Sequence, residues 1–223
     1  MPQKQKLKRV VDAYDRLKTD ILTSKLSPDF QAPEPEIADM LGMSRTPVRE
    51  ALIRLQSEGL VDLVPRRGAR VKSLGVDDIE ELHEILASLE AEVCFQLASR
   101  GITLAEIEEL NSFLAPISDA ELARDFESWL EADNRLRMKL FQMRGNGRLE
   151  HVAQTLIDQL HRGRMTLLTF AREPDCSVSE METVLAAVYS GDAQRAAKLA
   201  AGYRHSARKV LVERFRQAKL LSV

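Results

Sequence analysis

Two short helices joined by a tight turn are the feature that most restricts how this chain can fold. Residues 34–41 place apolar side chains at helical spacing after a proline-rich start that suits a first turn. Gly42 follows as a turn residue, and Ser44 is a good N-cap for the next helix. We expect that next helix to cover residues 45 to about 58. This spacing predicts a helix-turn-helix.

The segments on either side of these two helices complete a small domain. Upstream, four apolar residues at helical spacing predict a further helix: Val10, Tyr14, Leu17 and Ile21. Downstream, residues 60–65 and 69–74 have the pattern of two short strands around the turn "PRRG". Within the helix over 34–41, the residues expected to face the core are Ile37, Met40 and Leu41. Three helices and a hairpin in residues 1–73 therefore predict a winged helix-turn-helix domain, followed by a second domain over 74–223.

The charges of the chain are distributed unevenly between these two parts. The net charge of the whole chain is -2. Residues 1–73 hold 14 Lys and Arg against 10 Asp and Glu, whereas residues 74–223 hold 18 against 24. The N-terminal part, at +4, therefore suits a polyanion, and the C-terminal part, at -6, does not. Chance clustering of charge is the alternative interpretation.

Arginines at the start of the helix over 45–58 give this charge a specific position. Arg45, Thr46 and Arg49 lie near its first turn, away from the apolar stripe. A helix N-terminus favours phosphate through its dipole and free N–H groups, and arginines there can reach phosphates or guanine edges in a major groove. A second cationic contact for DNA is offered by the hairpin turn, which holds Arg66, Arg67 and Gly68. A solvated basic face is the alternative.

These residues resemble the DNA-binding signature of the GntR family of bacterial transcription regulators. The match is carried by "ADMLGMSRTPVREALIRLQSEGLV" followed by "PRRGARV", and it covers about residues 8–73. The resemblance implies a homodimer that binds a short palindromic DNA operator. It places on DNA the residues Ser44, Arg45, Thr46, Arg49, Arg66, Arg67 and Gly68. The chain departs from the pattern at Pro35, where many members carry a basic or polar contact residue, so no contact is expected there.

Residues 74–223 predict helices throughout, and the chain as a whole is expected to be mostly α. In this part we expect one helix around residues 82–93, a second over 103–115, and a third from near Asp119 to about Arg144. A fourth helix and two more follow. The segments "LEAEVCFQLAS", "EADNRLRMKLFQMRGNGRL" and "VLAAVYSGDAQRAAKLA" resemble the all-α FCD effector domain of the FadR branch of GntR regulators. "GNG" follows a helix and not a strand, so no nucleotide loop is expected.

Asp133 interrupts an apolar stripe, so its carboxylate is expected to face the interior. The FCD resemblance implies that this acid belongs to a metal site with three histidines. The three corresponding positions hold Arg137, Met181 and Tyr203. His205 lies two residues beyond Tyr203 and should face away. We therefore expect no bound metal, because a guanidinium and a thioether do not replace imidazole ligands.

Two interpretations of these interior residues stay open. Arg137 can pair with Asp133 one helical turn back, with Met181 and Tyr203 as core residues. Alternatively, all four residues form an effector pocket in which Arg137 holds the carboxylate of an anionic, partly apolar molecule such as an organic acid. Leu86 stands where many FCD relatives place a pocket arginine, which indicates a remodelled site.

Three classes of function compete. A ligand-responsive transcription regulator is favoured by two signatures in the expected order, and a DNA-binding architectural protein with an inert helical dimerisation domain is the alternative. An enzyme is not expected, because the four histidines have no nucleophile or acid pair at suggestive spacing and no cofactor loop is present. Cys94 and Cys176 predict buried, reduced thiols. The chain has no apolar run long enough for a membrane span, so we expect a cytoplasmic protein without a membrane partner.

Overall fold

The computed structural model describes the backbone of residues 2–168 and 173–221, and the side chains of residues 7–168 and 173–218. The chain divides into two compact units between Leu74 and Gly75. The sequence predicts this boundary after residue 73. Among the described residues, no helix is both long and apolar enough to cross a membrane.

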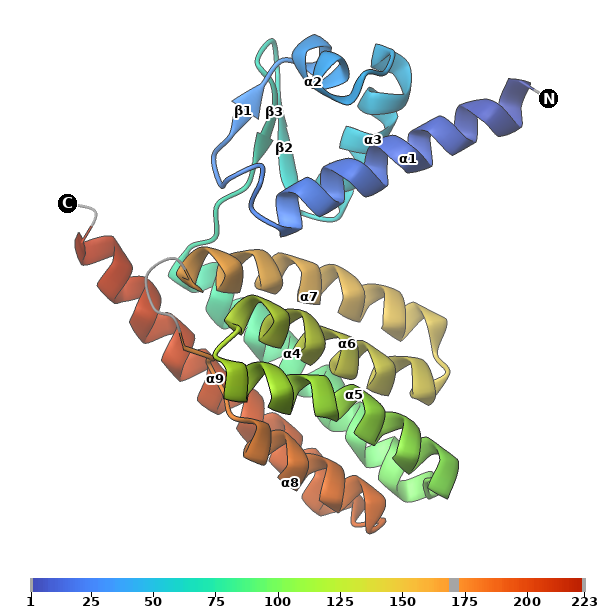
Figure 1. The fold of residues 1–223 in the computed structure, drawn as a ribbon, viewed down its shortest axis with the longest axis vertical. Coiled ribbons are helices and arrows are strands. Elements are labelled where there is room, and N and C mark those ends of the chain that lie inside the picture. The colour runs from blue at the N-terminus through green and yellow to red at the C-terminus, as the bar shows by residue number, and fades with distance from the viewer. Residues whose placement is uncertain (1, 169–172, 222–223) are drawn as a thin grey trace. The chain divides into compact units, whose positions relative to one another are not determined.

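The first unit is a winged helix-turn-helix, which confirms the predicted fold class of this part (Figure 1). Its elements are α1 (Pro2–Leu22), β1 (Gln31–Ala32), α2 (Glu34–Leu41), α3 (Arg45–Ser57), β2 (Val61–Val64) and β3 (Gly68–Val71). The sheet is antiparallel in the order β1-β3-β2, with Gln31 opposite Arg70. The sequence did not predict β1, because a two-residue strand has no periodicity of its own.

Apolar faces of the three helices form the core of this unit, but one predicted core residue lies outside it. Ile37 and Leu41 are buried as expected, whereas Met40 is 51% exposed, so the prediction for Met40 is wrong. Ala38 is buried instead. The reason is geometric: at 3.6 residues per turn, Ala38 and Met40 lie on opposite flanks of the stripe through Ile37 and Leu41, and the core covers only the Ala38 flank.

A polar cluster joins α1 to the end of α3. The Tyr14 hydroxyl donates to Glu58 Oε2 at 2.7 Å, and Lys18 Nζ donates to the same oxygen at 3.0 Å. Arg54 donates to Glu58 Oε1 at 3.2 Å while its Cζ lies 3.6 Å from the centroid of the Tyr14 ring. Burial alone would raise the pKa of Glu58, but the hydrogen bonds from Tyr14 and Lys18 outweigh it and hold this pKa below its ordinary value.

We expect this cluster to make the first unit sensitive to acid. A carboxyl whose pKa is lowered by folding stabilises the native state above its unfolded pKa, and this stabilisation is lost as the pH falls through the folded pKa. Glu58→Gln should cost about 1–3 kcal/mol at neutral pH and should weaken the acid dependence. Hydrogen-exchange protection factors of α1 and α3, measured against pH, test this. Asp20→Asn, which removes the charged partner of the exposed Lys25, is the control, and equal losses in both variants would contradict the prediction.

The second unit is a bundle of helices, as predicted (Figure 1). Its described helices are α4 (Val76–Arg100), α5 (Leu104–Ala123), α6 (Phe126–Arg144), α7 (Gly147–Leu168), α8 (Val178–Tyr189) and α9 (Ala193–Leu221). Capping boxes start α5 at Thr103 and α8 at Ser177. The most extensive helix–helix contact of the bundle is between α4 and α9, and α6 and α7 pack against α4. Residues from α4, α6, α7, α8 and α9 therefore meet in one interior.

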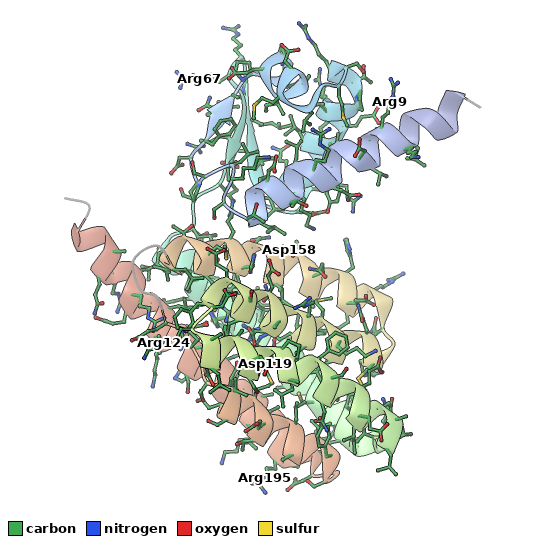
Figure 2. The ribbon with its side chains drawn as sticks, viewed as in Figure 1. Arg9, Arg67, Asp119, Arg124, Asp158 and Arg195 are labelled. Atoms are coloured by element: carbon green, nitrogen blue, oxygen red, sulfur yellow. The ribbon has the colours of Figure 1, made fainter. Side chains whose placement is uncertain are left out.

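The predicted start of a helix near Asp119 is wrong. Helix α5 continues through Pro116 and Asp119 to Ala123, and α6 begins only at Phe126. Arg124, marked in Figure 2, takes a left-handed backbone with φ 55° and ends α5. Asp125 then caps α6 by accepting a hydrogen bond from the backbone N–H of Ser128 at 3.2 Å. The break is set by this cap and not by the proline, which α5 accommodates within its length.

Candidate functional site

The start of α3 presents a polar, cationic surface to solvent. Ser44 is the N-cap residue with an extended backbone, and within the described residues its side chain makes no capping hydrogen bond. Arg45, Thr46 and Arg49 are exposed. On the opposite face, Val48 is fully buried in the core and holds the helix in place. The first-turn amides and two guanidinium groups therefore point outward from a fixed helix end, as an anion-binding surface requires.

A groove beside this helix end connects it to the hairpin. The groove is lined by residues of α2, α3 and the β2–β3 hairpin: Pro33, Glu34, Pro35, Arg49, Ile53, Leu63, Val64, Pro65, Arg66 and Gly68. Arg49 Nε lies 3.9 Å from a carboxylate oxygen of Glu34. This is a loose contact of an exposed arginine, and such contacts hold a side chain only weakly. Arg49 is thus free to change partners when an anion enters the groove.

The hairpin turn holds the second group of predicted contact residues. Arg66 and Arg67 are exposed, and Figure 2 shows Arg67 at the turn end of the hairpin. Arg66 adopts a left-handed backbone with φ 65°, and Gly68 has φ 87°. A Cβ added at Gly68 would lie 2.1 Å from the carbonyl oxygen of Ala32, so only glycine fits against β1. The structure therefore gives Gly68 a role in fixing the turn that carries the two arginines.

In the second unit, Asp133 and Arg137 meet as an ion pair in a larger buried network. Arg137 Nε donates to both oxygens of Asp133 at 3.0 Å, and its Nη1 donates to Glu90 Oε2 at 2.9 Å. Arg164 Nη1 donates to Asp133 Oδ2 at 2.8 Å and its Nη2 to Asp175 Oδ1 at 2.6 Å. Arg204 completes the network by pairing with Glu90. Six charged side chains from α4, α6, α7, α9 and the segment before α8 are linked in this way.

Burial and mutual charge fix the protonation of this network. Burial alone would raise the pKa of Asp133 and lower that of Arg137, but their attraction for the opposite charges nearby reverses both shifts. The two groups therefore stay ionised. Burial, reinforced by nearby arginines, lowers the pKa of His83 to about 2 and that of His161 to about 4. Both imidazoles are neutral at physiological pH.

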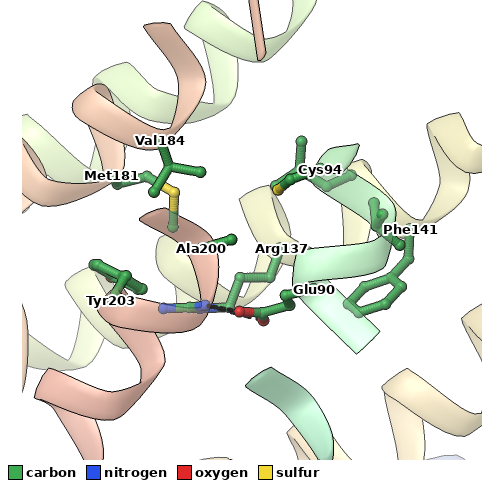
Figure 3. Close-up of a pocket in the computed structure, with 10 residues that line it drawn as sticks. Glu90, Cys94, Arg137, Phe141, Met181, Val184, Ala200 and Tyr203 are labelled. Carbon is green, nitrogen blue, oxygen red and sulfur yellow. Dashed lines mark hydrogen bonds and ion pairs between the residues drawn. The ribbon is translucent and has the colours of Figure 1, made fainter. Parts of the chain in front are cut away.

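A narrow cavity lies against this network (Figure 3). Its lining includes three of the four predicted pocket residues: Arg137, Met181 and Tyr203. Asp133 is not part of the lining and bonds to Arg137 instead. The Tyr203 ring lies 4.7 Å from the Arg137 Cζ, and its hydroxyl donates to Cys176 Sγ at 2.7 Å. The fold thus brings the four residues together, with Arg137 engaged by carboxylates of the chain itself.

Sequence reasoning missed four members of the network, Glu90, Arg164, Asp175 and Arg204. Glu90 and Arg204 offered a signal, because each interrupts an apolar stripe of its helix, as Asp133 does. His205 is exposed and Leu86 is buried. Both cysteines are free and buried. Within the described ranges, no group of three or more His, Cys, Asp or Glu is placed to hold a metal ion.

Comparison with known proteins gives the same division of the chain. A profile described as "Bacterial regulatory proteins, gntR family" matches residues 10–71, and one described as "FCD domain" matches residues 81–205. A helix-turn-helix transcriptional regulator of Agrobacterium vitis is 40% identical over 59% of this chain and 78% of its own length. Another from Streptomyces ambofaciens is 31% identical over 81% of this chain and 75% of its own length.

Solved structures show the same fold. A putative GntR regulator from Rhodococcus sp. RHA1 has a TM-score of 0.78 at 19% identity, covering 92% of this chain and 98% of that one. The Escherichia coli regulator McbR has a TM-score of 0.69 at 23% identity, covering 96% of each chain. At these identities the likeness concerns the fold alone.

Proposed function

Because the chain belongs to the GntR family of bacterial regulatory proteins and carries an FCD domain, we propose that it binds a short palindromic operator as a homodimer. Family membership makes it a DNA-binding transcription regulator with an effector-binding domain. An architectural protein with an inert helical domain is not favoured, since effector modulation is typical of the family. The family and its relatives are regulators and not enzymes.

The observation that carries the DNA-binding proposal is the exposed cationic end of α3 beside the cationic hairpin turn. We propose that Ser44, Arg45, Thr46 and Arg49 contact bases and phosphates in the major groove. In the same proposal Arg66 and Arg67 contact the neighbouring backbone or minor groove, and Gly68 shapes their turn. Arg49 would exchange its loose contact with Glu34 for a contact with DNA.

We propose that the effector binds in the second unit, at the cavity lined by Arg137, Met181 and Tyr203 and backed by Asp133. The sequence favoured an organic acid held by Arg137. That arginine is already paired with Asp133 and Glu90, so an acid would have to displace one of these carboxylates to reach it. A ligand changes operator affinity only if it binds the DNA-competent and the incompetent states with different strength.

The proposed function predicts a two-fold symmetric footprint on DNA. A short palindrome needs two recognition helices related by two-fold symmetry, so the purified protein should be a dimer in light scattering and should protect two half-sites about one helical turn apart. The candidate dimer surface is on α4 and α5, where Ile85, Leu104 and Leu122 are exposed apolar residues. Ile85→Glu is the variant to compare with the wild type. A monomer at micromolar concentration that still protects two half-sites would contradict the dimer.

A further inference from the structure

We propose that the cavity beside Arg137 takes a small uncharged ligand, which presents an oxygen acceptor to the guanidinium and an apolar body to the cavity walls. This inference rests on the effector role proposed above for the second unit and specifies the chemistry of the ligand. It replaces the carboxylate expected from the sequence. Three observations carry it: the charge balance of the interior, an unsatisfied donor, and the character of the walls.

The buried positive and negative charges in the interior of the second unit are equal in number. Apart from the two neutral histidines, its buried charged side chains within the described ranges are four arginines and four carboxylates: Arg137, Arg162, Arg164, Arg204, Glu90, Asp133, Asp158 and Asp175. Each guanidinium of the cavity network already faces a carboxylate. A ligand carboxylate would therefore add an uncompensated charge to a buried site, and burying a charge without a partner is strongly unfavourable.

One donor of the network is unsatisfied. Arg137 uses Nε for Asp133 and Nη1 for Glu90, whereas its Nη2 is buried without a hydrogen-bond partner among the described residues. The Arg137 side chain is only 2% exposed and lines the cavity (Figure 3). A buried donor without a partner costs free energy, which an acceptor oxygen on a ligand would recover without changing the charge of the site. The Tyr203 hydroxyl donates to Cys176, so Arg137 is the donor that a ligand would meet.

The rest of the cavity suits an apolar body of small size. Its walls include Val93, Leu140, Phe141 and Val184. The cavity volume is about 10 Å³, which is room for one water molecule. Met181 forms one wall, and its unbranched thioether side chain can take other rotamers. A ligand with a ring therefore needs Met181 to move, and shortening this residue should open the site.

Benzamide and benzoate test the proposal, because they have the same shape and differ in charge. Each is titrated by calorimetry into the full-length wild type and into Met181→Ala, with Val184→Ala as a second enlarged cavity should the first fold poorly. Benzamide should bind the enlarged site at least about tenfold more tightly than benzoate, since only benzoate brings an unpaired charge. Ala200→Leu, which adds a larger apolar side chain to the cavity lining and removes no charged group, should abolish benzamide binding when combined with the enlarging substitution.

Ligand binding and operator affinity are measured separately, so a wrong ligand chemistry can be distinguished from a wrong regulatory role. Equal or tighter binding of benzoate would overturn the uncharged ligand, and so would the failure of benzamide to bind either enlarged variant. Binding that survives Ala200→Leu would place the ligand elsewhere and would also overturn it. Operator affinity of the same preparations is measured with and without benzamide. Benzamide binding that leaves operator affinity unchanged would contradict the regulatory role while supporting the ligand chemistry.

Discussion

Replacing Arg137 with alanine is expected to destabilise the second unit by about 3–5 kcal/mol, because it leaves two buried carboxylates without this partner. Glu90 and Asp133 are 8% and 1% exposed at their side chains, so bulk solvent does not stabilise their charges in the folded protein. Urea unfolding followed by tryptophan fluorescence measures this loss of stability in the second unit alone. Trp129 is the single tryptophan of the sequence and is buried in α6, so its signal reports on this unit.

Arg135→Ala is the matched control for this experiment. Arg135 lies on the same helix two residues earlier and is exposed, so its loss should change the free energy of unfolding by less than about 0.5 kcal/mol. In Arg137→Ala the deficit should shrink as the pH falls, because Glu90 and Asp133, deprived of the guanidinium, protonate at a higher pH than in the wild type. Similar effects of the two substitutions would show that the network does not hold the bundle together.

Replacing Arg45 or Arg49 with alanine is expected to abolish specific operator binding. Each bidentate contact of an arginine with a base edge is worth roughly 1–3 kcal/mol of discrimination, so the variants should lose most of their preference for the operator over scrambled DNA. Both arginines are exposed at the end of a helix whose core side is fully buried. The substitutions should therefore leave the fold intact, and circular dichroism of the variants checks this.

The hairpin arginines provide a contrast within the same unit. Arg66→Ala or Arg67→Ala should weaken binding about equally for operator and scrambled DNA, and each should reduce the salt dependence by roughly one released counterion. Fluorescence anisotropy with both DNAs at several salt concentrations separates the two patterns, with Arg135→Ala as the unaffected control. Full affinity and sequence preference in Arg45→Ala would refute the docking of α3 in the major groove.

The elements that could be predicted from the sequence are those with local signals. The turn at Gly42, the cap at Ser44 and the amphipathic stripes predict α2 and α3 within a residue or two, because each signal lies next to the element that it delimits. By contrast, β1 exists only through its pairing with β3, with Gln31 opposite Arg70, and nothing local marks it. The break between α5 and α6 depends on one cap, at Asp125, which the prediction overlooked.

The buried network likewise contains contacts that no local feature of the sequence predicts. Asp133 and Arg137 are four residues apart on one helix, so their pairing could be read from the sequence. Glu90 is separated by 47 residues from Arg137 and by 114 from Arg204, and only the packing of α4 against α6 and α9 brings these groups together. The sequence therefore left open whether Arg137 pairs with Asp133 or holds a ligand, and the structure presents it already engaged by Asp133 and Glu90.

The matched charges inside the bundle also constrain how such a regulator can diverge. Loss of Glu90 leaves Arg204 without its carboxylate in a buried interior, and loss of Arg204 leaves Glu90 with Arg137 alone, so lineages that lose one member will survive chiefly where the other changes as well. Positions 90 and 204 should consequently vary together among descendants of this sequence, as two charges or as two apolar residues. New ligand preferences would then arise in steps of two substitutions, with an unstable intermediate between them.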